Sequence, residues 1–193
     1  MHNCDTRASE TAATQIADLF NEMAGEYDQI TDFWYAWLFS RLHYFLAFTI
    51  SKFPSKMACL DVGCGTGFQT NLLSLFGHDA LGIDIAGKLL DKARKKRAET
   101  YLTADLFESP FSFVRGYSEK IRAVAGEARG VHQLGKTEYL QASAISLPVE
   151  SESQDFVICG GSTLSSTKAT HREQALTDSL QSSHLFSSAR VFV

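Results

Sequence analysis

The chain has 193 residues and a mass of 21.3 kDa, which is enough for one domain with a substantial buried core. Hydrophobic residues make up 45% and charged residues 21%, a composition typical of soluble globular proteins. The formal net charge of -4 gives no indication of nonspecific binding to nucleic acid or to anionic lipid.

The cysteines and the N-terminus favour a cytoplasmic protein. The four cysteines form no C-x-x-C pair, so buried reduced thiols are the simplest interpretation, and no metal site is predicted. The N-terminal sequence MHNCDTRASET is polar and lacks the apolar core of a signal peptide. We therefore expect a cytoplasmic location.

Residues 1–56 are predicted to form an N-terminal helical lid segment. Their first apolar residues recur at helical spacing, at Ile16, Leu19, Phe20 and Met23. An aromatic helix follows and is expected to end near Pro54. Its apolar part, residues 33–50, is nearly long enough to cross a bilayer. A central arginine, Arg41, would cost at least ~2.5 kcal/mol there, so we expect a buried or surface-docked helix and no stable membrane span.

Residues 57–164 are predicted to form the α/β core. Short apolar strands are expected from residue 57, at 80–85, at 139–142 and at 156–159, with helices starting near Phe68 and Leu89. This alternation indicates a doubly wound, Rossmann-like, mostly parallel sheet. An irregular insertion or lid at about 100–137, with one short helix, is expected to interrupt it. Residues 165–193 are a Ser-rich, atypical C-terminal tail.

The stretch CLDVGCGTGF indicates a site for a small ligand. An apolar strand ends in Gly63, Gly65 and Gly67 and opens into a helix, so the backbone can approach a ligand closely. About twenty residues on, Asp84 ends the next strand, where it can accept hydrogen bonds from ribose hydroxyls. The spacing differs from the dinucleotide fingerprint, and Asp61 would repel a pyrophosphate but favour a sulfonium and an amino group. The pattern therefore favours S-adenosylmethionine over NAD.

The sequences LDVGCGTG and LGIDIAGKLLDKAR resemble those of class I S-adenosylmethionine-dependent methyltransferases, of the type that includes the ubiquinone and menaquinone biosynthesis enzymes. FNEMAGEYDQI resembles the segment ahead of the glycine motif in that group, and YLQASAISLPVESESQDFVICGGS resembles the third and fourth strands. The resemblance implies that one set of residues lines the methionine end of the cofactor: Asp61, Gly63, Gly65 and Gly67. Cys64, inside the same loop, is also predicted to border the cofactor, with its side chain as small apolar packing and not as a nucleophile.

The same resemblance implies roles for residues outside the glycine loop. Asp84 would hold the ribose hydroxyls, and Ile85 would pack on the adenine. Ser143, followed by Ala144, stands where the family often has an aspartate that binds the adenine amino group, so the hydrogen bond to adenine would be weaker. Two further residues would border the cofactor: Gly160 after the fourth strand and Tyr27 from the N-terminal helix.

The expected function is methyl transfer to a small-molecule acceptor, and the aromatic lid favours an apolar or aromatic one. No catalytic base is assigned, because in-line displacement on a sulfonium methyl needs little acid–base help beyond proximity and alignment. A structural or surface role is favoured for both His43 and His132. After Ser165 the family's remaining strands are not recognisable, so the chain reads as truncated or altered at its C-terminus. Two alternatives stay open. One is a non-catalytic remnant that binds cofactor weakly or scaffolds a partner, and the other is an NAD-dependent oxidoreductase.

Overall fold

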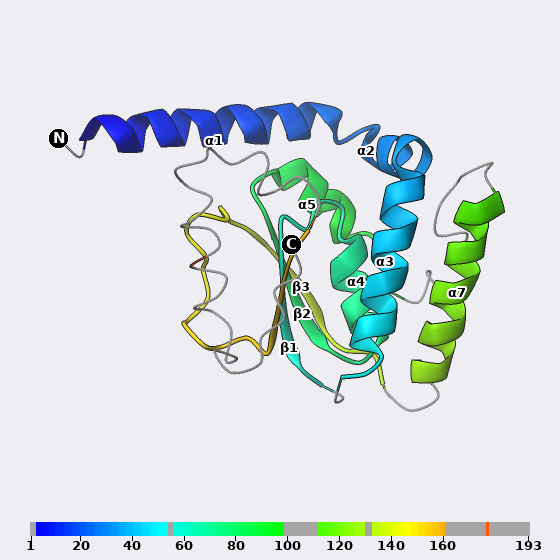
Figure 1. The fold of residues 1–193 in the computed structure, drawn as a ribbon. Coiled ribbons are helices and arrows are strands. Elements are labelled where there is room, and N and C mark those ends of the chain that lie inside the picture. Colours follow the sequence, from blue (N-terminus) through cyan, green and yellow to red (C-terminus); the bar gives the residue numbers. More distant parts are fainter. Residues whose placement is uncertain (1–2, 54–55, 99–111, 130–132, 161–176, 178–193) are drawn as a thin grey trace.

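The computed structural model describes residues 3–53, 56–98, 112–129, 133–160 and 177. Helices cover a four-stranded sheet in this part of the chain (Figure 1). The elements in chain order are α1 (Asn3–Met23), α2 (Tyr27–Gln29), the π-helical turn η1 (Ile30–Trp34), α3 (Ala36–Ile50), β1 (Ala58–Val62), α4 (Phe68–Leu75), β2 (Asp79–Asp84), α5 (Gly87–Ala93), α7 (Ser112–Arg129), β3 (Thr137–Gln141) and β4 (Phe156–Cys159).

The sheet has the order β3-β2-β1-β4, and every pair of neighbouring strands is parallel. The chain moves outward from β1 through β2 to β3 and then crosses back to place β4 on the other side of β1. The strand order therefore reverses between β1 and β4. In open α/β sheets ligands bind outside the carboxyl ends of the strands at such a point. The predicted Rossmann-like parallel α/β fold is confirmed.

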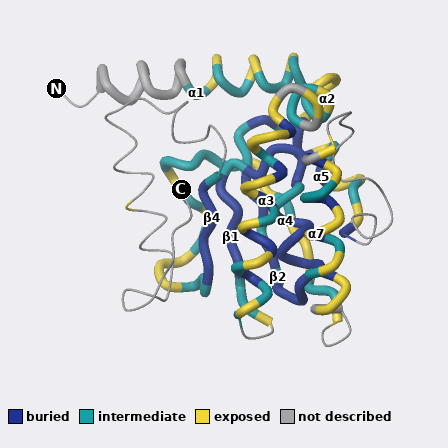
Figure 2. The backbone as a smooth tube through the Cα atoms, turned by 45° about the vertical axis from the view of Figure 1, so that its right-hand side comes forward, coloured by how far each residue is buried: buried dark blue, intermediate teal, exposed yellow. Residues whose placement is uncertain are grey.

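The two faces of the sheet bury different clusters (Figures 1 and 2). On one face, residues of β1 and β4 such as Cys59 and Phe156 pack against α3, α4 and α7. On the other face, a smaller cluster packs against residues between β3 and β4, which include Leu147 and Val149. Its buried members are Leu60, Val62, Ile83, Val157 and Cys159. Because the clusters use alternate positions along each strand, they fix the register of the sheet.

The region around α7 differs from its predicted structure. We expected one short helix in an irregular stretch, whereas α7 runs over 18 residues and lies beside α3. Its residues Val114, Ile121 and Ala125 are fully buried in the main core. Two glycines inside the helix, Gly116 and Gly126, obscured its apolar periodicity. A methyl group added at either glycine would have no atom within 4 Å, so the absence of a side chain there leaves no cavity in the core.

The aromatic stretch forms a helix with two unlike faces. One face of α3 is buried, through Ala36, Ser40, His43, Leu46, Ala47 and Ile50. None of the helices among the described residues combines the length and apolar character that crossing a bilayer requires. The C-terminal tail lies outside the described residues except for Thr177, so its altered character and the missing strands stay predictions.

His43 gives the fold a pH dependence. Its ring stacks on Phe68 with centroids 3.9 Å apart, and burial lowers its pKa from 6.5 to about 3. The unfolded chain takes up this proton below pH 6.5 and the folded chain does not, so stability falls as the pH drops from 6.5 toward 3. We expect the free energy of unfolding to fall by about 2 kcal/mol more between pH 7.5 and 5 in the wild type than in His43→Gln. Urea unfolding at both pH values measures this, and equal losses would contradict the assignment.

Candidate functional site

The glycine loop after β1 adopts a backbone that ordinary residues avoid. Gly63, Gly65 and Gly67 have φ values of 74°, 54° and 81°, all in the left-handed region. The backbone N–H groups of Gly63 and Cys64 both donate to the carbonyl oxygen of Ile83, at 2.8 and 2.9 Å. The loop is thus fixed against the end of β2 before the chain enters α4. The alternate glycine spacing in the sequence reflects this conformation.

Tyr27, which the resemblance implies would border the cofactor, lies against the loop. For a methyl group placed on Gly65, the three nearest atoms all belong to the Tyr27 ring and hydroxyl, at 3.5–3.7 Å. The ring also packs edge-on against Phe20, with centroids 6.2 Å apart, and contacts the small cluster of Ala24, Ala86 and Leu89. The N-terminal segment therefore covers the glycine loop.

Asp61 is a buried carboxyl group that lacks a full set of partners. It is 0% exposed, and its Oδ2 accepts a 2.7 Å hydrogen bond from the hydroxyl of Thr70. Its Oδ1 is buried and meets no hydrogen-bond donor among the described residues. Burial, with a smaller contribution from Asp84, raises the pKa of Asp61 to about 7. A buried acceptor without a donor is rare in folded proteins, so this oxygen is a candidate acceptor for a donor on a ligand.

Asp84 joins the glycine loop to β2. Its Oδ2 accepts from the backbone N–H of Gly65 and its Oδ1 from that of Ala86, both at 2.8 Å. Burial raises the pKa of Asp84, although these amide donors act in the opposite direction. Each of these bonds occupies one lone-pair site of an oxygen that offers two. The carboxyl group can therefore hold the loop and still accept hydrogen bonds from further donors.

A packed layer beneath the loop holds it in place. Tyr139 reaches from β3 so closely that a methyl group on Gly67 would lie 2.5 Å from its hydroxyl oxygen. A methyl group on Gly82 would lie 2.7 Å from the Thr70 hydroxyl oxygen and 2.9 Å from the Cys64 sulfur. The Cys64 side chain thus points into this layer. Burial, with the carboxyl groups of Asp61 and Asp84, raises the pKa of its thiol, which fits the predicted packing role.

The remaining predicted site residues follow the other strands. Ile85 is half-buried after β2, and its carbonyl oxygen accepts a 3.0 Å bond from Gln141. Ser143 follows β3, where its hydroxyl accepts a 3.4 Å bond from Ile145 N–H. Ala144 packs on the smaller sheet cluster. After β4, a methyl group on Gly160 would lie 2.8 Å from the amide of Gln69.

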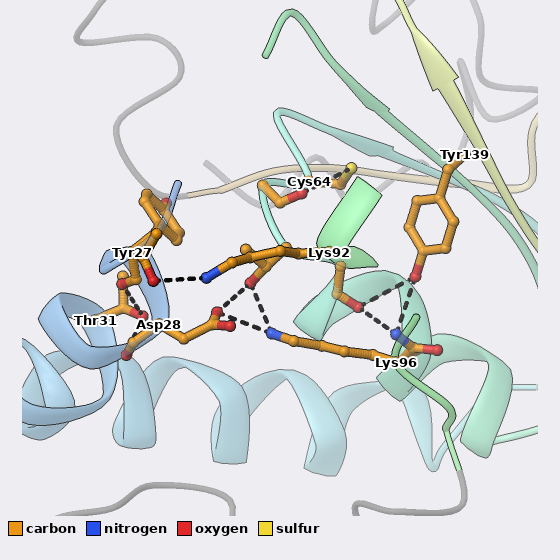
Figure 3. Close-up of polar contacts among 12 residues, drawn as sticks. Tyr27, Asp28, Thr31, Cys64, Lys92, Lys96 and Tyr139 are labelled. Atoms are coloured by element: carbon orange, nitrogen blue, oxygen red, sulfur yellow. Dashed lines mark hydrogen bonds and ion pairs between the residues drawn. The ribbon is translucent and has the colours of Figure 1, made fainter. Parts of the chain in front are cut away.

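A polar cluster that the sequence did not reveal ties the lid to the loop (Figure 3). Asp28 Oδ1 accepts bonds from the Thr66 hydroxyl at 2.6 Å and from Lys96 Nζ at 2.9 Å. Lys96 Nζ also donates to the Thr66 hydroxyl at 2.8 Å. Burial acts to raise the pKa of Asp28, but the hydrogen bonds from Thr66 and Lys96 lower it overall. We call these three residues the latch.

Two further contacts attach the end of α1 to α5. Asn21 Oδ1 accepts a 2.9 Å bond from the backbone N–H of Lys88 at the start of α5. The position before that helix is Ala86, which has no side-chain acceptor, so Asn21 supplies the cap from a distant segment. Lys92 Nζ donates to the carbonyl oxygen of Gly25 at 2.9 Å, as Figure 3 shows for the Lys92 side chain.

The geometry unites some of the predicted site residues and separates others. Tyr27, Asp61, Asp84 and the three glycines meet at the carboxyl ends of β1 and β2, whereas Ser143 and Gly160 follow the outer strands β3 and β4. Within the described ranges, no group of three or more His, Cys, Asp or Glu side chains could hold a metal ion.

Residues 60–113 match a known protein family, described as a methyltransferase domain. A malonyl-[acyl-carrier protein] O-methyltransferase of Hamiltonella defensa subsp. Acyrthosiphon pisum (strain 5AT) is 32% identical over 101 residues, which are 50% of this chain and 36% of that protein. The matched segment is similar to a methyltransferase domain and carries the glycine loop and Asp84. The chain spans about a third of the length of this curated relative.

Solved structures share the fold at low sequence identity. One, described as an S-adenosyl-L-methionine-dependent methyltransferase from Methanococcus maripaludis, has a TM-score of 0.55 and 13% identity. The match covers 89% of this chain and 62% of that one. A chain from a Haloferax volcanii complex of the Trm112 methyltransferase activator and a methyltransferase has a TM-score of 0.50 and 15% identity, over 85% and 55% of the two chains. These likenesses support the methyltransferase fold.

The raised pKa of Asp61 predicts a cost in stability. Between about pH 4 and 7 the unfolded chain loses the Asp61 proton while the folded chain keeps it, so this group lowers stability as the pH rises. We expect Asp61→Asn to raise the free energy of unfolding at pH 8, by up to about 4 kcal/mol, and to have little effect at pH 4. Urea unfolding at both pH values checks this, with exposed Asp91→Asn as the control. A variant less stable than the wild type at pH 8 would contradict it.

The latch predicts a local effect of removing Lys96. Lys96→Met leaves the half-buried Asp28 without its cation, so we expect faster amide hydrogen exchange in residues 20–35 and little change in the sheet. The neighbouring Lys95→Met is the matched control, because Lys95 is exposed and lies outside the latch. Hydrogen exchange read by mass spectrometry distinguishes the two. Equal protection of residues 20–35 in both variants would show that the ion pair does not hold the lid.

Proposed function

We propose that this chain binds S-adenosylmethionine at the carboxyl ends of β1 and β2 and transfers its methyl group to a small-molecule acceptor. The observation that carries the proposal is the buried Asp61 Oδ1, which has no donor among the described residues. A cofactor with a cationic amino group would supply that donor. Asp84 would accept bonds from the ribose hydroxyls, and Tyr27 would cover the loop side of the site.

The chemistry asks little of acid or base groups. Bound S-adenosylmethionine supplies a methyl group on a sulfonium, which an acceptor atom attacks in line as the sulfur leaves. The chain's own residues would bind and orient the two reactants and exclude water. Such positioning can remove a large part of the activation barrier in reactions of this kind. His43 does not serve as a base in this proposal, because it is stacked in the core and its pKa is lowered to about 3. His132 lies outside the described residues.

For the methyl acceptor we propose a chemical class and no single compound. We infer a small acceptor with apolar or aromatic character, on the ground that residues 33–50 of the lid segment are rich in aromatic side chains. The curated relative is described as acting on a malonyl-[acyl-carrier protein], so a carboxyl group is one acceptor to test. The resemblance to quinone-biosynthesis enzymes remains a prediction.

The alternatives to methyl transfer gain no support from the matches, which are to methyltransferases. Asp61 and Asp84 bring two carboxyl groups to the loop, where a dinucleotide would place its pyrophosphate. We also infer a reducing, cytoplasmic location, since the described cysteines Cys59, Cys64 and Cys159 are all free and buried.

Titration calorimetry with S-adenosylhomocysteine tests the cofactor assignment. We expect micromolar binding by the wild-type chain and binding at least about tenfold weaker in Asp84→Ala, because two charge-assisted hydrogen bonds to ribose are lost. Asp61→Asn should also weaken binding, and exposed Asp91→Asn should leave it unchanged. NAD is the ligand control, and a thermal melt establishes that each sample folds. A cooperatively folded chain that binds NAD as well as S-adenosylhomocysteine, or that binds neither, would overturn the proposal.

A further inference from the structure

The outer face of α3 is an exposed apolar surface. We define the α3 face by five large side chains that are exposed despite their chemistry: Trp37 (52%), Leu38 (37%), Leu42 (42%), Phe45 (55%) and Phe48 (47%). They recur at helical spacing opposite the buried side that contacts α4 and α7. Exposed apolar side chains that stand singly are normal, but a contiguous set on one helix marks an interaction surface.

The charges on α3 and directly after it have one sign. Residues 33–60 contain no Asp or Glu, whereas Arg41 lies on the α3 face and Lys52 follows its end. Lys52 Nζ sits 4.9 Å from the centroid of the Phe48 ring. On the neighbouring helix α7, Lys120 Nζ lies 5.6 Å from the Tyr44 ring. Lysine and arginine side chains packed on aromatic rings can extend their charges beyond an apolar surface.

The neighbouring helix does not reverse this sign. Among the described residues of α7 the exposed charges are Arg115, Glu119, Lys120 and Glu127, two of each sign, and Arg122 is half-buried, so α7 adds no net negative charge beside the α3 face. The net charge of -4 is carried elsewhere on the chain, and for this reason the overall composition gave no indication of lipid binding. The positive charges of Arg41 and Lys52 favour a negatively charged partner, and the exposed apolar side chains between them favour a partner with an apolar layer beneath its charged surface.

We propose that the α3 face docks on the surface of an anionic lipid bilayer. The aromatic and leucine side chains would enter the headgroup boundary, and Arg41 and Lys52 would meet the lipid phosphates. The helix lies on the membrane in this proposal and does not cross it, in agreement with its length and charge. The interaction involves neither Asp61 nor Asp84, so it stands independently of the cofactor.

Vesicle binding tests the proposal directly. The only two tryptophans of the chain are Trp34 and Trp37, so intrinsic fluorescence reports on this region. We expect the full chain to sediment with vesicles of equal parts phosphatidylglycerol and phosphatidylcholine, and its emission to shift to the blue. Pure phosphatidylcholine vesicles and high salt should weaken binding, because lipid charge and screening set the electrostatic part.

Paired variants distinguish binding through the α3 face from nonspecific hydrophobic adsorption to vesicles. Phe45→Ser with Phe48→Ser should weaken binding about tenfold or more, while Leu19→Ser, which removes an equally exposed side chain on α1, should not. Arg41→Glu with Lys52→Glu should abolish the preference for anionic vesicles. Both side chains are exposed, so the core packing should not change. Circular dichroism confirms that each variant folds.

Three outcomes would overturn the proposal. The first is a folded wild-type chain that stays in solution with either kind of vesicle. The second is equal binding to anionic and zwitterionic vesicles. The third is a dimer that both phenylalanine substitutions dissociate, measured by light scattering, since the α3 face would then be an interface between two copies. Each result is independent of whether the chain binds S-adenosylhomocysteine.

Discussion

The position of Asp84 at the end of β2 is the constraint on which the site depends. Its carboxylate receives the N–H of Gly65 on one side and that of Ala86 on the other, while Ile83 receives the first two amides of the loop. The three left-handed glycines can therefore form one defined loop instead of many. Because β2 is itself paired with β1 and β3, the loop inherits its rigidity from the centre of the sheet.

This arrangement places two carboxyl groups near one another in a poorly hydrated region, and that has a cost. Burial raises the pKa of both Asp61 and Asp84, and the carboxyl group of Asp84 contributes a smaller part of the rise at Asp61. A sequence selected for stability alone would place an amide or an apolar residue at position 61. The carboxyl group with an unmatched oxygen therefore makes sense as a feature of ligand binding, since functional sites are where folds depart from local optimisation.

The sequence predicted the parts of the structure that local patterns encode. The glycine spacing, the apolar runs of β1 and β2 and the acidic residue closing β2 all involve neighbours within a few residues. The latch was missed because it joins residues 38 and 68 positions apart, none of which has an unusual local pattern. The full length of α7 was missed because two glycines interrupt its periodicity, although buried contacts with the rest of the core stabilise the helix.

The same distinction explains how the lid differs from the core. The strands and α4 are held by fully buried apolar clusters, whereas the segment around Tyr27 is attached by a small cluster of Ala24, Ala86 and Leu89 and by polar contacts from Asn21, Asp28 and Gly25. Polar contacts of partly exposed groups contribute little free energy each, so such a segment opens at lower cost than the sheet unfolds. Local opening of the lid would therefore expose the glycine loop at low cost, while Asp84 and β2 hold the loop in place.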